Sequence, residues 1–177
     1  MLINILIGVA VVIALLVIFV AMRPSEFRVT RQGAIGAPPS AVFPQVNDFH
    51  NWEAWSPWAK LDPAASNSFE GPTAGTGATF RWAGNKEVGE GNMTITESRP
   101  NDLIRLRLEF LKPFAATNTT EFAFQPEGGQ TVVTWSMFGK NSFMSKAVGL
   151  FMDCEKMVGG QFEQGLANMK SVVEAKP

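Results

Sequence analysis

The sequence predicts an α+β fold in which a curved antiparallel sheet wraps around a long C-terminal helix, with one transmembrane helix at the N-terminus. Three observations support this prediction. The first 22 residues carry no charge, several later segments alternate apolar and polar residues, and the last segment repeats apolar residues at helical spacing. A period of two indicates strands with one buried face, whereas steps of three and four indicate an amphipathic helix.

Residues 1–22 are expected to cross a membrane. Apart from Asn4 the segment is apolar, and about 20 such residues span the hydrocarbon core as a helix. A cleaved signal peptide would have a basic start and a small-residue cleavage site, but no Lys or Arg precedes Arg23 and the residues before it make a poor site. A buried core helix would show a polar face. We therefore favour a single-pass anchor over both alternatives.

The charges after the anchor predict its orientation. Arg23, Arg28 and Arg31 follow it, while only the α-amino group is basic before it. The positive-inside rule then places the domain on the cytoplasmic side of the membrane. Because residues 23–26 form only a short linker, we expect the domain at residues 27–175 to lie close to the bilayer.

Composition argues against several classes of function. The chain has 15 basic and 16 acidic residues and a net charge of −1, which is not the basic footprint of a nucleic-acid-binding protein. Cys154 is the only cysteine and His50 the only histidine. The sequence contains no CxxC, HExxH, GxGxxG or Walker-type motif. We therefore expect no internal disulfide, no metal, no cofactor and no nucleic-acid partner.

The domain is expected to begin with a strand at residues 27–35. Prolines then introduce a short helix near residues 40–46, and the tryptophan-rich segment 47–63 is interpreted as a second short helix that runs into a loop. Alternation is clearest at residues 103–110, where four apolar residues take one face and Arg105, Arg107 and Glu109 take the other, solvated one. The remaining expected strands are 78–83, 91–98, 116–125 and 130–139.

The last segment, residues 143–174, is the only long helical pattern available to cover the buried face of the sheet. Gly159 and Gly160 interrupt it at a cost of about 2 kcal/mol relative to two alanines, which predicts a bend or a close approach to the sheet. Cys154 falls on its apolar stripe and is interpreted as a small buried hydrophobe. The stripe is Leu150, Cys154, Val158, Phe162, Leu166, Met169 and Val173.

Motifs along the domain resemble those of a known family. They are Ala37-Pro38-Pro39, Asn47-Asp48-Phe49, Trp55-Ser56-Pro57-Trp58, Trp82-x-Gly84-Asn85, Val88-Gly89-x-Gly91-x-Met93, Val133-Thr134-Trp135 and Phe162-Glu163-x-Gly165-Leu166-Ala167-Asn168. This set resembles the polyketide cyclase/dehydrase-type branch of the START-like (SRPBCC) superfamily over residues 27–175. The resemblance implies the helix-grip fold and an apolar cavity between the sheet and the last helix. It carries over no catalytic motif.

The inward-facing residues are the candidate ligand-binding site. They could form a packed core or line a cavity, and apolar pockets with a few polar groups are the usual ligand sites. Eight Met and 14 Phe favour the cavity, because methionine adapts to varied shapes. The candidates are Trp55, Phe80, Trp82, Met93, Leu108, Phe110, Phe122, Trp135, Met137 and Phe162.

Several other residues have two or more interpretations. Trp52, Trp55 and Trp58 could cap the core, form a lid or contact the membrane. Asn118 and Thr120 share the parity of the inward residues and are candidates for polar groups inside the cavity, but exposure at a strand end is the favoured interpretation. His50 could act as a general base, but a lone histidine is more often structural.

The leading hypothesis is binding of a hydrophobic small molecule or lipid by a membrane-tethered domain. One alternative is a cyclase- or dehydratase-like enzyme, and another is an interaction domain with a filled core. Beyond His50 and the nearby Asp48 and Glu53, no acid/base pair is visible, so the sequence disfavours catalysis.

Overall fold

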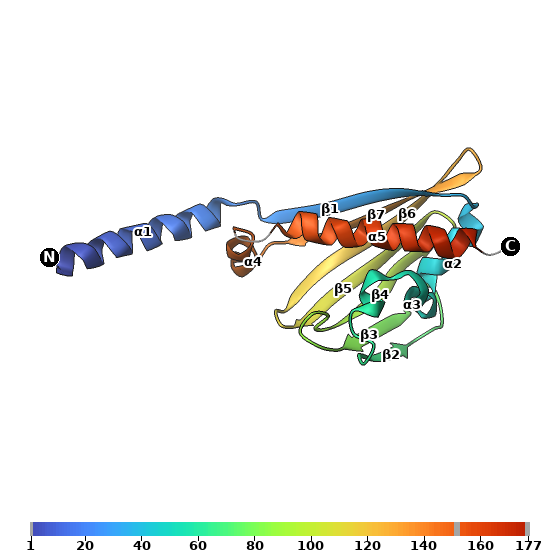
Figure 1. Cartoon of the computed structure of the whole chain (residues 1–177), viewed down its shortest axis with the longest axis horizontal. Helices are drawn as coiled ribbons and strands as arrows, with labels where there is room; N and C mark the ends of the chain where they lie inside the picture. The colour runs from blue at the N-terminus through green and yellow to red at the C-terminus, as the bar shows by residue number, and fades with distance from the viewer. Residues whose placement is uncertain (1, 151–152, 176–177) are drawn as a thin grey trace.

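The computed structural model describes residues 2–150 and 153–175, and it confirms the predicted fold class (Figure 1). The N-terminal helix is α1 (Leu2–Met22), and the long C-terminal helix is α5 (Cys154–Glu174). Short helices are α2 (Pro39–Asn47), η1 (Phe49–Asn51), α3 (Trp52–Trp55), η2 (Pro57–Lys60) and α4 (Phe143–Val148). The strands are β1 (Glu26–Ile35), β2 (Ser66–Glu70), β3 (Thr79–Ala83), β4 (Glu90–Arg99), β5 (Leu103–Lys112), β6 (Ala116–Glu127) and β7 (Gln130–Lys140).

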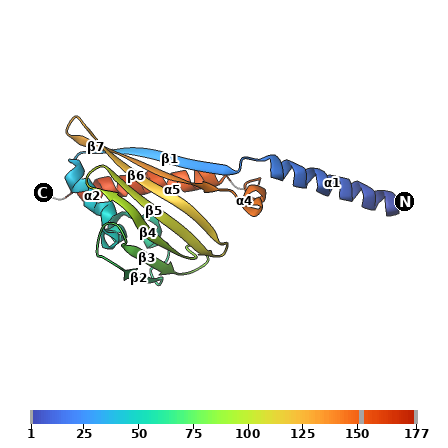
Figure 2. The ribbon, with the colours of Figure 1, turned by 180° about the vertical axis from the view of Figure 1, so that it is seen from behind.

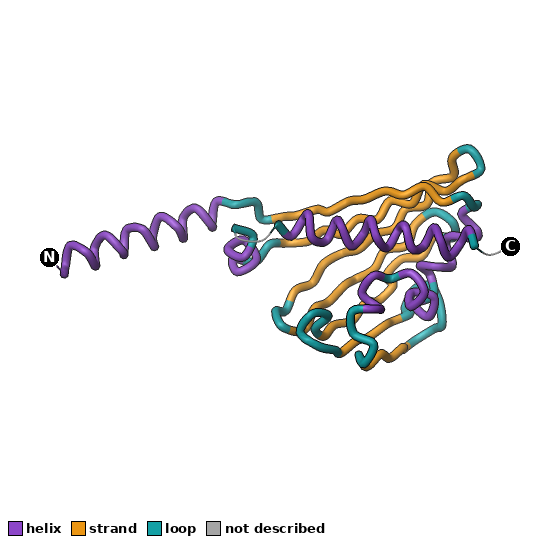
Figure 3. Tube along the Cα trace, viewed as in Figure 1, coloured by secondary structure: helices purple, strands orange, loops and turns teal. Residues whose placement is uncertain are grey.

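The seven strands form one antiparallel sheet in the order β1-β7-β6-β5-β4-β3-β2. The sheet curves, so that α5 runs along the concave side beside β1 and β7, while β5 to β2 bend away (Figures 1 and 2). The short helices α2 and α3 lie near the C-terminal end of α5 (Figure 3). The core is therefore enclosed between the concave face, α5 and these short helices.

Alternation in β5 produces the expected burial. Ile104 and Leu106 are completely buried, whereas Arg107 is exposed. Arg105 differs from the prediction because it is half-buried between Glu97 and Glu121, which accept its hydrogen bonds. The polar face of β5 is therefore mostly solvated, but Arg105 on that face is partly covered by Glu97 and Glu121 from the neighbouring strands.

The edge strand β2 was not predicted. Its sequence, Ser-Asn-Ser-Phe-Glu, has no apolar alternation, and all five residues are exposed. It pairs only with β3, on the sheet's outer edge. A strand held mainly by backbone pairing leaves no hydrophobic pattern in the sequence, which explains the omission.

The single helix predicted over residues 143–174 is wrong, because two helices occupy this segment. α4 ends at Val148, and α5 begins after Asp153, whose side chain accepts a hydrogen bond from the backbone N–H of Lys156. Such an N-cap favours a new helix start within the predicted apolar stripe. Leu150 consequently lies before α5, and the side chain of Cys154 lies outside the described part of the chain. The buried stripe of α5 is Phe162, Leu166, Met169 and Val173.

Two glycines let α5 approach the sheet closely. At Gly159, a Cβ atom would collide with the guanidinium of Arg31 from β1. At Gly165, it would lie 2.7 Å from the ring of Trp135 and 3.2 Å from Pro57. The close approach predicted for the glycine pair is therefore present at Gly159, where a β1 side chain crosses the helix.

α1 lies outside the domain (Figure 1), and of its described side chains only Val20 is buried. This exposure contradicts the core-helix alternative. By length and composition the helix can cross a membrane, a test that a signal sequence near the N-terminus would also pass. Its end is bound to α4 and the loop that follows: Arg23 Nη1 donates to Gly149 O at 2.9 Å, and Lys146 Nζ to Ala21 O at 3.3 Å.

Candidate functional site

The strand register arranges the inward side chains in rows that cross the sheet. Three rows run in order toward the end of the sheet where α1 joins β1. The inner row is Val29, Met137, Thr120, Leu106 and Ile95. The middle row takes one residue from every strand: Phe27, Gly139, Asn118, Leu108, Met93, Phe80 and Phe69. The outer row is Ala116, Phe110, Gly91 and Trp82.

Burial decreases from the inner row to the outer row. Every member of the inner row is at most 8% exposed. In the middle row Phe80 and Met93 are half-buried and Phe69 is 44% exposed, and in the outer row Phe110 and Trp82 are half-buried. We call the middle and outer rows the open half of the concave face. It is an apolar surface that α5 and the short helices do not fully cover.

Beyond the inner row, away from α1, the interior is filled by aromatic rings. Trp135 stacks on Phe162 of α5, with ring centroids 4.1 Å apart and planes 10° apart. Phe122 lies 4.7 Å and Trp55 5.6 Å from the Trp135 ring. With Trp52, these residues form what we call the aromatic cluster. Each is at most 5% exposed, which is the close packing of an ordinary core.

The three tryptophans after α2 belong mainly to the core cap. Trp52 and Trp55 are buried, and their indole N–H groups donate to Val46 O at 3.0 Å and Gln45 O at 2.9 Å. Trp58 is half-buried and lies edge-on to Trp135 and Phe162, at 6.0 and 6.3 Å. Burial excludes Trp52 and Trp55 from the membrane-contact interpretation.

In the outer row, aromatic rings lie directly against the backbone of the sheet. Gly91 has no side chain, so the Trp82 indole lies directly over the β4 backbone, where any Cβ would collide with it. Trp82 Nε1 donates to Val88 O at 3.0 Å, which fixes the ring. Phe110 meets the indole edge-on at 6.2 Å, and Phe80 stacks beside it at 5.9 Å. The open half therefore presents aromatic faces that are already held in place.

Two buried polar atoms, one in the inner row and one in the aromatic cluster, have no hydrogen-bond partner among the described residues. They are Thr120 Oγ1, in a residue 3% exposed, and Trp135 Nε1, in a residue 2% exposed. An unsatisfied buried donor costs roughly 1–3 kcal/mol, so native proteins rarely keep one without a reason. Asn118, also buried, lies over Gly139 in the middle row. Asn118 and Thr120 therefore face inward, as their parity indicates, and the strand-end exposure favoured for them from the sequence is wrong.

Charged residues hold α5 over the sheet on the side of β1. Arg31 donates from Nε to Glu163 at 2.5 Å and from Nη1 to Glu155 at 2.8 Å. Hydrogen bonds to Glu155 and Glu163 raise the pKa of Arg31, so its charge is secure at any ordinary pH. Near the other end of the helix, Glu174 accepts from Gly36 N–H and Lys170, which lowers the pKa of Glu174. The helix is thereby tied at both ends across the aromatic cluster.

His50 lies at the rim rather than among the inward residues. Its Nδ1 atom is 2.7 Å from Asp48 Oδ1, its ring stacks on Phe69 of β2 at 4.1 Å, and half of its side chain is exposed. The Asp48 side chain also accepts a hydrogen bond from the backbone N–H of His50 and thereby caps the N-terminus of η1. These contacts indicate a structural role, in which the His50–Asp48 pair packs against the edge strand β2. Within residues 2–150 and 153–175, no three His, Cys, Asp or Glu side chains gather as metal ligands.

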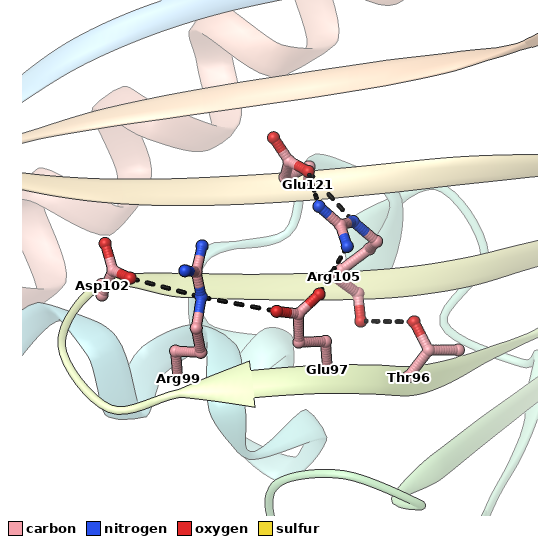
Figure 4. A network of polar contacts seen from close by, with 6 residues as sticks. All are labelled: Thr96, Glu97, Arg99, Asp102, Arg105 and Glu121. Carbon is pink, nitrogen blue, oxygen red and sulfur yellow. Dashed lines mark hydrogen bonds and ion pairs between the residues drawn. The ribbon is translucent and has the colours of Figure 1, made fainter.

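The convex face of the sheet carries an ion-pair network instead (Figure 4). Arg105 bridges Glu97 and Glu121, and Arg99 lies between Glu97 and Asp102, at 3.4 and 3.3 Å. The hydrogen bond to Glu121 is the main cause that raises the pKa of Arg105. An open groove on this face is lined by Arg105, Thr119 and Phe138. Because its arginine is already neutralised by two carboxylates, we favour the concave face as the site.

Comparison with known proteins identifies the family. The sequence profile of the family described as polyketide cyclase/dehydrase and lipid transport matches residues 26–174. The chain belongs to this family. No curated protein matches this member of the polyketide cyclase/dehydrase and lipid-transport family in sequence.

Solved structures similar to this family member come from several bacteria. A Mesorhizobium loti protein has a TM-score of 0.63 at 14% identity, covering 85% of this chain and 99% of that one. A Chromobacterium violaceum protein has a TM-score of 0.60 at 15% identity, with coverages of 86% and 99%. A Rhizobium leguminosarum protein has a TM-score of 0.60 at 16% identity, with coverages of 85% and 96%. At these identities they show the shared helix-grip fold alone.

In this polyketide cyclase/dehydrase and lipid-transport family member, the ten predicted site residues divide into two groups. Four lie in the aromatic cluster: Trp55, Phe122, Trp135 and Phe162. Six lie in or next to the open half: Phe80, Trp82, Met93, Leu108 and Phe110 belong to it, and Met137 borders it in the inner row. Sequence parity assigned the eight that lie on strands to the correct face but not to their depth. Phe27 and Phe69 of the middle row were missed, because their short or weakly alternating strands gave no clear parity.

Proposed function

We propose that the domain, tethered to a membrane by α1, binds a hydrophobic small molecule or lipid on the open half of its concave face. The observation that carries this proposal is the buried hydroxyl of Thr120, which has no hydrogen-bond partner among the described residues and lies in the inner row that borders the open half. An apolar surface with a few polar atoms is the usual composition of a ligand site. Membership of a family described by cyclases, dehydrases and lipid transport supports the same class of ligand.

The packed aromatic cluster limits where such a ligand lies. Trp135 and Phe162 are in van der Waals contact, and Gly165 leaves no room beside them. We therefore place the apolar part of the ligand over Phe80, Met93 and Phe110, and its polar atom at Thr120. One polar contact at the end of an apolar surface suits a molecule with a single oxygen-bearing end.

The tether predicts how the protein fractionates. Because α1 is uncharged, 21 residues long and exposed, the full chain is expected to sediment with membranes and to resist alkaline carbonate. Residues 26–177, which retain all the elements of the domain, are expected to be soluble. Protease added to sealed cells should spare the domain if it is cytoplasmic. Recovery of the protein in the soluble fraction would contradict the tether, either because α1 has been cleaved or because it has not inserted.

Replacing Thr120 by valine separates ligand binding from stability. In the empty domain the change removes an unsatisfied hydroxyl, so the free energy of unfolding should stay equal or rise by about 1 kcal/mol. If Thr120 donates to the ligand, the affinity for a fluorescent aromatic ketone should fall by roughly 2- to 10-fold, the equivalent of one hydrogen bond. Urea unfolding and fluorescence titration of residues 26–177 measure the two quantities.

The matched control is Thr119→Val, on the neighbouring residue of β6 whose side chain faces the convex side. It should change neither probe affinity nor stability by more than about 0.5 kcal/mol. Equal loss of affinity in both variants would show that the probe does not bind at Thr120. If the parent domain binds no probe and retains no lipid in native mass spectrometry, an interaction domain with a filled core becomes the better interpretation.

A further inference from the structure

The surface nearest α1 carries a group of large apolar side chains in contact with solvent. Phe114 is 67%, Met144 58%, Leu111 54% and Phe143 52% exposed. Leu111 and Phe114 come from the end of β5 and the turn that follows it, and Phe143 and Met144 from the first turn of α4. We call these four residues the anchor-end patch. Among the described residues outside α1, Met157 is the only other large apolar residue that is more than half exposed.

The strand register places both parts of this patch at the same end of the sheet. Glu26, four residues after α1, pairs with Lys140, and α4 begins three residues later. On the next strand Asn118 pairs with Gly139, so the β5–β6 turn also lies at this end. Both views of the ribbon show that turn and α4 on the side of the domain that faces α1 (Figures 1 and 2).

α4 is fixed at the point where α1 ends. Arg23 donates to Gly149 O, and Lys146 donates to Ala21 O and, at 3.2 Å, to Ser25 Oγ. If α1 spans the bilayer, these contacts hold α4 at the level of the lipid headgroups. Exposed Phe, Leu and Met side chains at that level enter the boundary between headgroups and acyl chains, which removes apolar area from water.

Because the patch adjoins the end of α1, we propose that the anchor-end patch docks on the lipid bilayer beside α1. The inference rests on the proposed tether and extends it, because it fixes which end of the domain touches the membrane. Leu111 directly follows Phe110 of the outer row, so the docked patch brings the open half to the bilayer surface. A lipid-like ligand then passes between membrane and site without crossing bulk water. The partner is the bilayer itself rather than a second protein.

The test uses the full chain, with Cys154→Ser to remove the native thiol. Phe114→Cys or Met144→Cys receives an environment-sensitive NBD label, and each protein is reconstituted into phosphatidylcholine vesicles with or without nitroxide-labelled lipid. Both labels should emit at shorter wavelength than in water and lose emission to the nitroxide. The matched control is Glu127→Cys, next to the β6–β7 turn at the opposite end of β6, which should emit as in water and remain unquenched.

Vesicle flotation separates failure of this inference from failure of the tether. If the chain floats with vesicles but the labels at positions 114 and 144 stay in water, docking is wrong while the tether stands. If those labels are shielded without nitroxide quenching, and the shielding grows with the protein-to-lipid ratio, the patch contacts a second copy and docking is again wrong. If the chain does not float, the tether fails and the inference fails with it.

Discussion

Leu106→Ala is expected to lower the free energy of unfolding of the domain by about 2–5 kcal/mol, the usual range for truncating a buried leucine. Leu106 is completely buried in the inner row, between Ile95 of β4 and Thr120 of β6. Its removal leaves a void against the core that the paired strands on either side cannot close. Urea unfolding of residues 26–177 monitored by tryptophan fluorescence measures the loss.

The neighbouring residue provides the control. Arg107 is exposed on the convex face and pairs with Glu109 at 2.6 Å, where a surface ion pair contributes little. Arg107→Ala should therefore change stability by no more than about 0.5 kcal/mol. If the two substitutions had similar effects, the assignment of the two faces of β5 would be wrong.

Local sequence pattern was sufficient for elements whose burial alternates. In β5 and β7, side chains two residues apart point to one face, so the pattern of Leu106 or Trp135 with its neighbours determines both the strand and its orientation. It was insufficient for β2, which is exposed on every residue, and for the start of α5, where Asp153 caps a helix inside an apolar stripe. Backbone pairing and capping act where hydrophobic periodicity carries no signal.

The depth of the candidate site could not be read from the sequence. Phe122 and Phe110 are both inward-facing phenylalanines in alternating strands, yet the first is completely buried and the second is half-exposed. Their difference depends on how the sheet curves and on where α5 crosses it, and Arg31 and Gly159 determine that crossing from distant parts of the chain. Thr120 was recognised by parity, but only the structure shows that its hydroxyl has no partner among the described residues.

Phe162→Ala is expected to destabilise the domain by about 3–5 kcal/mol. The Phe162 ring is 2% exposed, stacks on Trp135 and meets Trp58 edge-on, so its loss removes contacts on two sides at once. Phe162→Trp should also destabilise, by about 1–3 kcal/mol, because the filled stack has no space for a larger ring. Thermal or urea unfolding of residues 26–177 checks both values.

The matched comparison is Phe110→Ala, the same truncation in the open half. Phe110 is half-buried, so less apolar area returns to water and the stability loss should be smaller than at Phe162. Its ring forms part of the proposed binding surface, and its removal should weaken binding of the aromatic ketone. At Phe162 the new void should leave that binding unchanged or strengthen it, since apolar cavities accept apolar probes. If Phe162→Ala instead kept full stability and lost the probe, the ligand would lie between Trp135 and α5, and the aromatic cluster would be the site rather than the support beneath it.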